Sequence, residues 1–321
     1  MISDNLSNAI KLLNEGNLIA IPTETVYGLA ANAFDPVAVS KIFEVKNRPK
    51  FDPLIVHSYS IEKIKEFVIS FPEKSLLLAE TFWPGPLTLI LKKKNIIPDI
   101  VTSGLDSVAV RIPNHPLTLK LLSMLDFPLA APSANPFGYV SPTEPKHVQA
   151  QLGDKIPFIL NGGKCKVGIE STIVGFEGEK AIIYRLGGLS VEDIKEVIGK
   201  VKINLHSSSN PLAPGQLDKH YSPNKTIVLD LEVIKSFEKS DVGAIVFSDL
   251  IENIPIENQL VLSKNRDYSE AARNLFSILR ETENLAVKII YAELLPEEGL
   301  GRPINDRLRR ASVKSKLSHD K

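Results

Sequence analysis

The feature that most constrains the fold is a break in the hydrophobic pattern of the chain. Before the break, short apolar runs alternate with amphipathic segments along residues 1–204. Within residues 205–225 the composition turns to Ser, Pro, Asn and Gly and the periodicity is lost, which is typical of a linker. The alternation then resumes. Since 321 residues suffice for two hydrophobic cores, we predict a larger domain at 1–204, a linker at 205–225 and a smaller domain at 226–321.

The order of elements in the first region predicts an α/β domain with a mixed, twisted sheet. Helices are predicted at 36–46, where Pro36 favours a helix start, and at 73–82. Neighbouring strands late in the region argue against a strictly alternating parallel arrangement. The predicted strands cover residues 17–22, 53–59, 85–93, 107–113, 128–135, 158–163, 171–176 and 181–187.

The second region predicts a smaller, Rossmann-like α/β domain. Strand patterns alternate with helical patterns, which favours a parallel sheet with crossover helices. The region contains no G-x-G-x-x-G fingerprint, so its fold alone implies no dinucleotide cofactor. The predicted strands are 226–231, 243–248, 259–263 and 285–294, and the predicted helices are 268–283 and 301–312.

Composition and short motifs exclude several classes of function. Lys plus Arg and Asp plus Glu both number 38, so no overall basic field draws the chain to nucleic acid. Cys165 is the only cysteine, which rules out an intrachain disulfide and a cysteine-based zinc site. The histidines form no metal-binding pattern, so we predict no protein-held metal. Gly163–Gly168 has the glycine spacing of a phosphate loop, but Ile169 and Glu170 replace the required Lys and Ser or Thr.

The sequence also predicts a cytoplasmic protein without a membrane partner. Its first residues form an amphipathic helical pattern instead of a basic segment followed by an apolar core. No apolar run approaches the length of a membrane span. A single cysteine fits a reducing compartment.

Polar residues gather at the ends of the predicted strands, where α/β proteins place ligands. Lys46, Arg48 and Lys50 form a predicted exposed turn ahead of the strand that contains His57. Cations combined with hydroxyl groups suit a polyphosphate, because both kinds of donor complement its oxygens. The other polar residues at the ends of predicted strands are Thr23, Glu24, Thr25, Arg111, Ser133, Asn135, Ser171, Thr172 and Arg185.

Each of these residues, taken alone, also has a structural explanation. Ser133 can belong to a turn, Arg111 can pair with a surface carboxylate, and His57 can be a hydrogen-bonded core histidine. Arg111 would equally suit a substrate carboxylate, which it can grip with two parallel bonds. No pair of well-placed carboxylates offers acid–base chemistry, so any catalysis would rest on positioning and electrostatics.

Taken in order, the longer motifs resemble one family, the YrdC-like threonylcarbamoyl-AMP synthases. The motifs are "PTETVYGLAANA", "KNRP", "DPLIVH", "FWPGPLTLIL", "VAVRIPNHP", "APSANPFGYVSPT" and "GIESTIVGF", and the similarity runs from about residue 5 to 200. "PGQLDKHYSP" and "GLGRPINDRLRRAS" resemble the long form of the enzyme, which has an additional C-terminal domain. The resemblance implies a YrdC-like first domain and a small Rossmann-like second domain.

The resemblance also implies a reaction and its partners. L-threonine, bicarbonate and ATP would give L-threonylcarbamoyl-AMP and pyrophosphate, with Mg²⁺ held mainly by the ATP phosphates. The product would pass to a tRNA threonylcarbamoyl-transferase complex, and a weak contact with RNA stays open.

Individual residues acquire roles by the same resemblance. The active-site residues of the Lys-x-Arg and Ser-x-Asn motifs are Lys46, Arg48, Ser133 and Asn135. The ATP contacts are Arg48, Asp52, Ser107, Ser133, Ser141, Arg185 and Tyr221. The threonine contacts are Thr25, His57, Arg111, Ala131 and Ser171. Tyr221 lies in the linker, which we expect to close over the nucleotide as a lid.

Asp52 departs from the family pattern. Many relatives carry "DNPL" where this chain has "FDPL", so Asp52 replaces an asparagine at a predicted ATP contact. A carboxylate there would repel phosphate unless it faces the base, the ribose or the metal.

Two other functions compete with this interpretation. The carbamoyltransferase of hydrogenase maturation contains a YrdC-like domain, but it also carries cysteine-rich zinc fingers, which a chain with Cys165 alone lacks. An RNA-binding module without catalysis would use the local cationic run Lys92–Lys94, although the balanced total charge argues against it. Exchange of pyrophosphate into ATP that requires both threonine and bicarbonate would separate a synthase from a binder.

Overall fold

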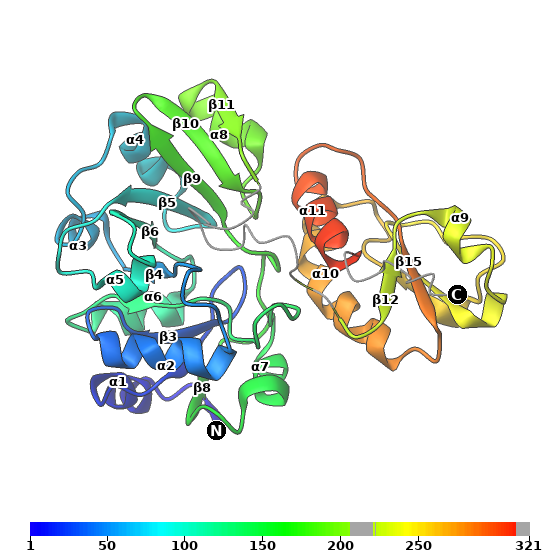
Figure 1. The fold of residues 1–321 in the computed structure, drawn as a ribbon, viewed down its shortest axis with the longest axis horizontal. Helices are drawn as coiled ribbons and strands as arrows, with labels where there is room; N and C mark the ends of the chain where they lie inside the picture. Colours follow the sequence, from blue (N-terminus) through cyan, green and yellow to red (C-terminus); the bar gives the residue numbers. More distant parts are fainter. Residues whose placement is uncertain (206–220, 222, 313–321) are drawn as a thin grey trace. The chain divides into compact units, whose positions relative to one another are not determined.

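The computed structural model describes residues 1–205, 221 and 223–312, which divide into two compact units. Of these residues, the first unit contains 1–137 and 141–205, and the second contains 138–140, 221 and 223–312 (Figure 1).

A single mixed sheet forms the framework of the first unit, as the sequence predicts. Among the described residues it has eleven strands in the order β1-β8-β2-β3-β7-β4-β6-β5-β9-β10-β11. β2 pairs antiparallel with β3, whereas β4 pairs parallel with β6, so both senses of pairing occur. The strands are β1 Ile2–Ser3, β2 Ile19–Ile21, β3 Gly28–Asn32, β4 Ile55–His57, β5 Leu87–Lys92, β6 Ser107–Arg111, β7 Leu129–Ala130, β8 Phe158–Leu160, β9 Thr172–Glu177, β10 Lys180–Arg185 and β11 Val201–Ile203.

Helices cover both faces of this sheet. Successive residues of β2 face opposite sides, so Ala20 joins one hydrophobic cluster and Ile19 and Ile21 join another. The first cluster draws side chains from α2, α4 and α8, and the second draws them from α1 and α6. The helices are α1 Leu6–Asn14, α2 Pro36–Lys46, α3 Ile61–Lys65, α4 Glu73–Phe82, α5 Asp99–Thr102, α6 Pro116–Ser123, α7 Pro145–Leu152 and α8 Val191–Ile198.

Local sequence signals set the two ends of α2. The Asp35 side chain accepts a hydrogen bond from the backbone N–H of Val37, and Pro36 occupies the first turn. The helix ends where Asn47 adopts a left-handed conformation with φ 52°. These signals fix Lys46 as the last residue of the helix.

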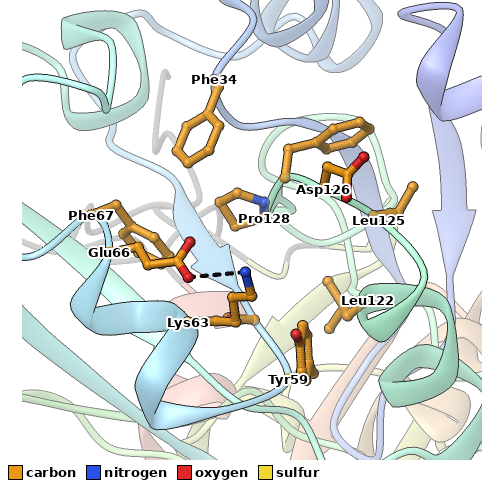
Figure 2. Close-up of a pocket in the computed structure, with 11 residues that line it drawn as sticks. Phe34, Tyr59, Lys63, Glu66, Phe67, Leu122, Leu125, Asp126 and Pro128 are labelled. Atoms are coloured by element: carbon orange, nitrogen blue, oxygen red, sulfur yellow. Dashed lines mark ion pairs between the residues drawn. The ribbon is translucent and has the colours of Figure 1, made fainter.

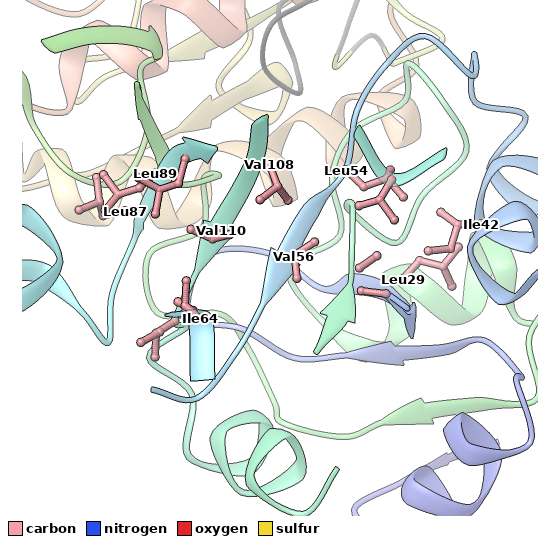
Figure 3. Close-up of a cluster of buried hydrophobic side chains, with 14 of the residues drawn as sticks. Leu29, Ile42, Leu54, Val56, Ile64, Leu87, Leu89, Val108 and Val110 are labelled. Carbon is pink, nitrogen blue, oxygen red and sulfur yellow. The ribbon is translucent and has the colours of Figure 1, made fainter. Parts of the chain in front are cut away.

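A row of apolar side chains crosses the centre of the sheet (Figure 3). Val56 of β4 pairs in register with Val110 of β6, which pairs in turn with Leu89 of β5. All three are fully buried. Because strand residues alternate in direction, the neighbouring residues His57 and Arg111 point to the opposite face.

The second unit confirms the prediction of a small parallel sheet. Its four described strands run in the order β12-β15-β13-β14, and each adjacent pair is parallel. The strands are β12 Thr226–Val228, β13 Val242–Val246, β14 Gln259–Val261 and β15 Ile289–Ala292, and the α-helices are α9 Leu231–Ile234, α10 Tyr268–Glu281 and α11 Gly301–Ser312.

We expect Leu89→Ala to lower the free energy of unfolding of the first unit by about 2–5 kcal/mol, because it leaves a cavity beside Val110. Leu77→Ala in α4 is the matched control, since Leu77 is 44% exposed. Urea unfolding followed by the fluorescence of Trp83, the only tryptophan, measures this unit directly. Equal stability losses in the two variants would contradict the placement of Leu89 in the core.

Candidate active site

Two parallel strands bring His57 and Arg111 to the same edge of the sheet. β4 ends at His57, β6 ends at Arg111, and the two residues are paired in the strand register. Each is only 3% exposed. A polar pair buried at the carboxyl ends of parallel strands is in the position where α/β proteins place ligand-binding groups.

The guanidinium of Arg111 is surrounded by acceptors. Its Nε donates to the carbonyl of Gly85 at 3.1 Å, and its Nη1 donates to Oγ1 of Thr25 at 2.9 Å. Its Nη2 lies 2.7 Å from Oε1 of Glu24. The Thr25 hydroxyl is fixed in turn by a hydrogen bond with the hydroxyl of Thr23, at 2.7 Å. Arg111 is therefore a rigid, buried cation of the kind that recognises a carboxylate.

His57 is uncharged at neutral pH. Burial, and secondarily the positive charge of Arg111, lower the pKa of His57 to about 3. Its Nδ1 has no hydrogen-bond partner among the residues that the structure describes. A neutral imidazole with a vacant nitrogen can hydrogen-bond a hydroxyl group of a ligand.

Lys46 is buried, which corrects the expectation of an exposed cationic turn; of the three cations in that turn only Lys50 is exposed. The Lys46 ammonium donates to the carbonyl oxygens of Ser133 and Asn135, at 2.5 Å each. Burial, together with the charge of Arg48, lowers the pKa of Lys46 well below its usual value. Two loop carbonyls thus provide the hydrogen bonds that a buried amine requires, and Lys46 holds the Ser-x-Asn loop in place.

Arg48 is also buried, and it forms an ion pair with Asp52. Its Nη2 lies 2.9 Å from Oδ2 of Asp52 and donates to the carbonyl of Pro53 at 2.9 Å. Its Nε donates to the Asp52 carbonyl at 3.1 Å. The negative charge of Asp52 is therefore compensated within the turn, which weakens the objection that this carboxylate would repel phosphate.

Ser171 links the predicted ATP and threonine contacts. Arg185 donates from Nη2 to the Ser171 hydroxyl and from Nε to its carbonyl, both at 3.0 Å. The Ser171 hydroxyl also shares a hydrogen bond of 2.7 Å with that of Thr88. Ser141 donates to Oε1 of the adjacent Glu170 at 2.6 Å. The predicted ATP contacts Arg185 and Ser141 are therefore linked to the predicted threonine contact Ser171, Arg185 directly and Ser141 through Glu170.

The loop that carries Ala131 and Ser133 lies against the segment that follows β2. Ser133 forms an isolated antiparallel bridge with Gly28, and the N–H of Ala134 donates to the carbonyl of Tyr27 at 2.8 Å. A Cβ atom on Gly28 would lie only 3.1 Å from that of Ala131, so glycine permits this close approach. The loop runs beside Ile55 at the start of β4, whereas His57 ends that strand. Thr25 belongs to the segment that the loop contacts and bonds Arg111, so this segment links the two predicted sets of contacts.

Ser107 and Tyr221 are placed differently. Ser107 begins β6, at the opposite end of the strand from Arg111. Tyr221 belongs to the second unit, where its ring stacks on Phe276 with the centroids 5.4 Å apart, and the Arg307 guanidinium lies 5.3 Å from its centroid. Residues 206–220 and 222 of the predicted lid lie outside the described residues. The ATP-binding roles of Ser107 and Tyr221 stay predictions.

A small pocket lies elsewhere in the first unit and is lined by none of the predicted site residues (Figure 2). Across its rim, Lys63 and Glu66 form an exposed ion pair of 2.9 Å. In the described part of the chain, no group of three or more His, Cys, Asp or Glu side chains is placed to hold a metal ion. Across the same residues, no helix has the length and apolar character needed to cross a membrane.

Three further side chains contact predicted site residues although no motif gave them a role, namely those of Glu24, Glu170 and Thr88. Glu24 stands between two threonines at the end of a buried strand, and Glu170 immediately precedes Ser171. A carboxylate next to a hydroxyl residue at a strand end is the signal that could have identified both. Thr88 lies inside β5 and carries no comparable signal.

Comparisons with known proteins match both units. A family model of the Sua5/YciO/YrdC type, described as "Telomere recombination", matches residues 11–187. A second model, described as "Threonylcarbamoyl-AMP synthase, C-terminal domain", matches residues 189–313.

Relatives of full length agree with these models. The threonylcarbamoyl-AMP synthase of Pyrococcus abyssi is 40% identical over 315 residues, which cover 95% of this chain and 93% of the relative. The enzyme of Bacillus subtilis is 35% identical over 320 residues, or 96% of this chain and 92% of the relative.

A solved structure shows the same architecture. The crystal structure of P. abyssi Sua5 complexed with L-threonine is similar with a TM-score of 0.89 and 39% identity, over 96% of this chain and 94% of that one. Because these matches cover both units of the chain, they favour a synthase of this kind over the carbamoyltransferase of hydrogenase maturation. The chain belongs to the threonylcarbamoyl-AMP synthase family, in the form that joins a YrdC-type domain to a C-terminal domain.

Proposed function

We propose that this protein makes L-threonylcarbamoyl-AMP from L-threonine, bicarbonate and ATP, with release of pyrophosphate, for the threonylcarbamoyl modification of tRNA. The observation that carries the proposal is the buried Arg111 guanidinium, which lies beside the neutral His57 and donates to Thr25, in the segment that the loop held by Lys46 packs against. A P. abyssi relative with the same fold is complexed with L-threonine, which supports the amino-acid half of the site.

The threonine subsite would use Arg111 for the carboxylate. Thr25 and His57 lie beside that guanidinium and would bind the threonine hydroxyl. Ala131 and Ser171 would line the remaining wall. Because the guanidinium is held rigidly and the imidazole is neutral, neither group has to move or change its protonation state when threonine binds.

The ATP subsite would use buried arginines and the hydroxyl groups of the loops. Arg48 and Arg185 would neutralise phosphate oxygens, and the loop that Lys46 holds would present its side chains to the nucleotide. Mg²⁺ would enter as the Mg·ATP substrate, since the described residues offer no cluster that could hold it alone. The contacts proposed for this subsite are Arg48, Asp52, Ser107, Ser133, Ser141, Arg185 and Tyr221, and Asn135 is proposed as an active-site residue of the same loop as Ser133.

The chemistry would need orientation and charge neutralisation more than proton transfer. The amine of threonine and bicarbonate first combine to a carbamate with loss of water. A carbamate oxygen then forms a bond to the α-phosphorus as the bond from that phosphorus to pyrophosphate breaks, with the two oxygens in line. Buried cations on both sides of the reacting atoms would stabilise the charge that develops on the phosphate oxygens.

The wider setting follows from this activity. The product carries a reactive mixed anhydride and would pass to a tRNA threonylcarbamoyl-transferase complex in the cytoplasm, with at most a weak contact between this chain and RNA. We retain the domain boundaries 1–204 and 226–321, with residues 205–225 as a lid that shields the product from water.

Incubation with ATP, threonine and ¹³C-bicarbonate, followed by mass spectrometry, tests the proposed function. We expect a product with the mass of threonylcarbamoyl-AMP that carries the label, together with pyrophosphate. ATP hydrolysis without a labelled product, or no dependence on threonine, would contradict the proposal.

We expect Arg111→Lys to weaken threonine binding by about 10–100-fold, or roughly 1.4–2.8 kcal/mol, because lysine cannot grip a carboxylate with two parallel bonds. ATP binding should change little, since the phosphates contact other cations. Calorimetric titration of each ligand measures the difference, with Lys63→Ala in the exposed ion pair as control. Equal losses of threonine and ATP affinity would count against a threonine-specific role.

We expect His57 to make stability dependent on pH. Its pKa of about 3 lies below the ordinary value of 6.5, so the unfolded chain binds a proton that the folded chain does not. Stability should therefore fall as the pH decreases from 6.5 toward 3, by at most about 1.4 kcal/mol per pH unit from this group. His57→Gln should lose this component in urea unfolding curves compared at several pH values. The same pH dependence in both proteins would show that His57 is not buried in its neutral form.

A further inference from the structure

A buried carboxylate faces the guanidinium proposed to bind threonine. Oε1 of Glu24 lies 2.7 Å from Nη2 of Arg111, and the two side chains are 5% and 4% exposed. A buried charge is strongly unfavourable without a partner, so each of these groups depends on the other. Removal of Glu24 would leave Arg111 with an uncompensated charge in a site with little access to water.

Backbone contacts hold Glu24 in a fixed position. Its Oε2 accepts a hydrogen bond from the backbone N–H of Asn114 at 3.0 Å, just beyond the end of β6. Its own carbonyl accepts from the N–H of Val167 at 2.7 Å. The carboxylate is thereby anchored to the strand that carries Arg111 and cannot follow a guanidinium that moves away.

The contact between the two charges leaves hydrogen-bonding capacity on Arg111. A guanidinium has five N–H donors, of which Nε donates to Gly85 and one on Nη1 donates to Thr25. The Nη2 group is close to Glu24 but is not aligned with it as a hydrogen bond, and it has no other acceptor among the described residues. N–H groups on both Nη atoms therefore remain for a ligand.

We infer that Glu24 is a positioning residue, which holds the Arg111 guanidinium in place while leaving its N–H groups to the threonine carboxylate. The inference rests on the proposed threonine-binding role of Arg111. Glu24 compensates the charge through proximity, and Thr25 and Gly85 fix the plane of the group. The substrate carboxylate then meets a donor that is already oriented, so less ordering is needed on binding.

The test compares threonine with threoninamide, which has the same shape but lacks the carboxylate charge. We expect Glu24→Gln to lower threonine affinity by at least about tenfold and threoninamide affinity by less than about twofold, in calorimetric titrations. Glu24→Asp keeps the charge but withdraws it from the guanidinium on a shorter side chain, so its threonine affinity should lie between those of the natural protein and of Glu24→Gln. In an Arg111→Lys background, Glu24→Gln should cause a much smaller further loss.

Glu66→Gln is the matched control, because it removes a carboxylate from the exposed pair with Lys63. It should leave the affinities for both ligands unchanged. The emission of Trp83 and thermal unfolding report whether each variant is folded. If Glu24→Gln does not fold, the ratio of threonine to threoninamide affinity in Glu24→Asp decides the question, and a ratio equal to that of the natural protein overturns the inference.

Other outcomes of the same titrations also overturn it. Equal losses for both ligands would show a general structural role for Glu24, and tighter threonine binding by Glu24→Gln would show that Glu24 competes with the substrate. Failure of the natural protein to bind threonine, together with no labelled product, would instead refute the proposed function. The two failures are therefore distinguishable.

Discussion

The site depends on the compensation of cationic side chains that the fold buries at the strand ends. Burying an ionised group without partners costs several kcal/mol or more, so each cation needs acceptors supplied by the protein. Carbonyl oxygens surround the ammonium of Lys46, and a carboxylate lies against each of two guanidinium groups. The resulting pairs are Arg48 with Asp52 and Arg111 with Glu24.

This compensation explains how the site can combine two anionic substrates without a pair of acid–base carboxylates. The cations are fixed before the ligands arrive, because carbonyl or carboxylate groups of the protein already hold each of them. Preorganised charges of this kind favour a transition state in which negative charge moves along the phosphate chain, because they need no reorientation during the reaction. The neutral His57 adds polarity without adding another charge.

Much of the fold could be predicted from the sequence, because periodicity and end signals act locally. Helix α2 begins at Pro36, where the sequence indicates a helix start, and the second sheet is parallel as the alternation of patterns predicts. Strand β3 at Gly28–Asn32 escaped prediction because its small residues carry little β propensity; tertiary packing between β2 and β7 decides it.

The site was harder to predict than the fold. Motif resemblance identified the candidate residues, but it could not reveal which of them form hydrogen bonds or ion pairs within the protein. The burial of Lys46 depends on carbonyls of Ser133 and Asn135, 87 and 89 positions away in sequence, and the contact of Glu24 with Arg111 spans a similar separation. Contacts between distant segments leave no periodic signal in either one.

A crystal structure of the protein bound to L-threonine would decide whether buried, compensated cations organise the site. We expect the threonine carboxylate to lie within about 2.7–3.2 Å of the Arg111 Nη atoms. Arg111 should stay in contact with Glu24, and His57 should lie beside the threonine hydroxyl. A threonine carboxylate bound away from Arg111, or an Arg111 side chain that leaves Glu24 when threonine binds, would contradict a site organised by compensated, buried cations.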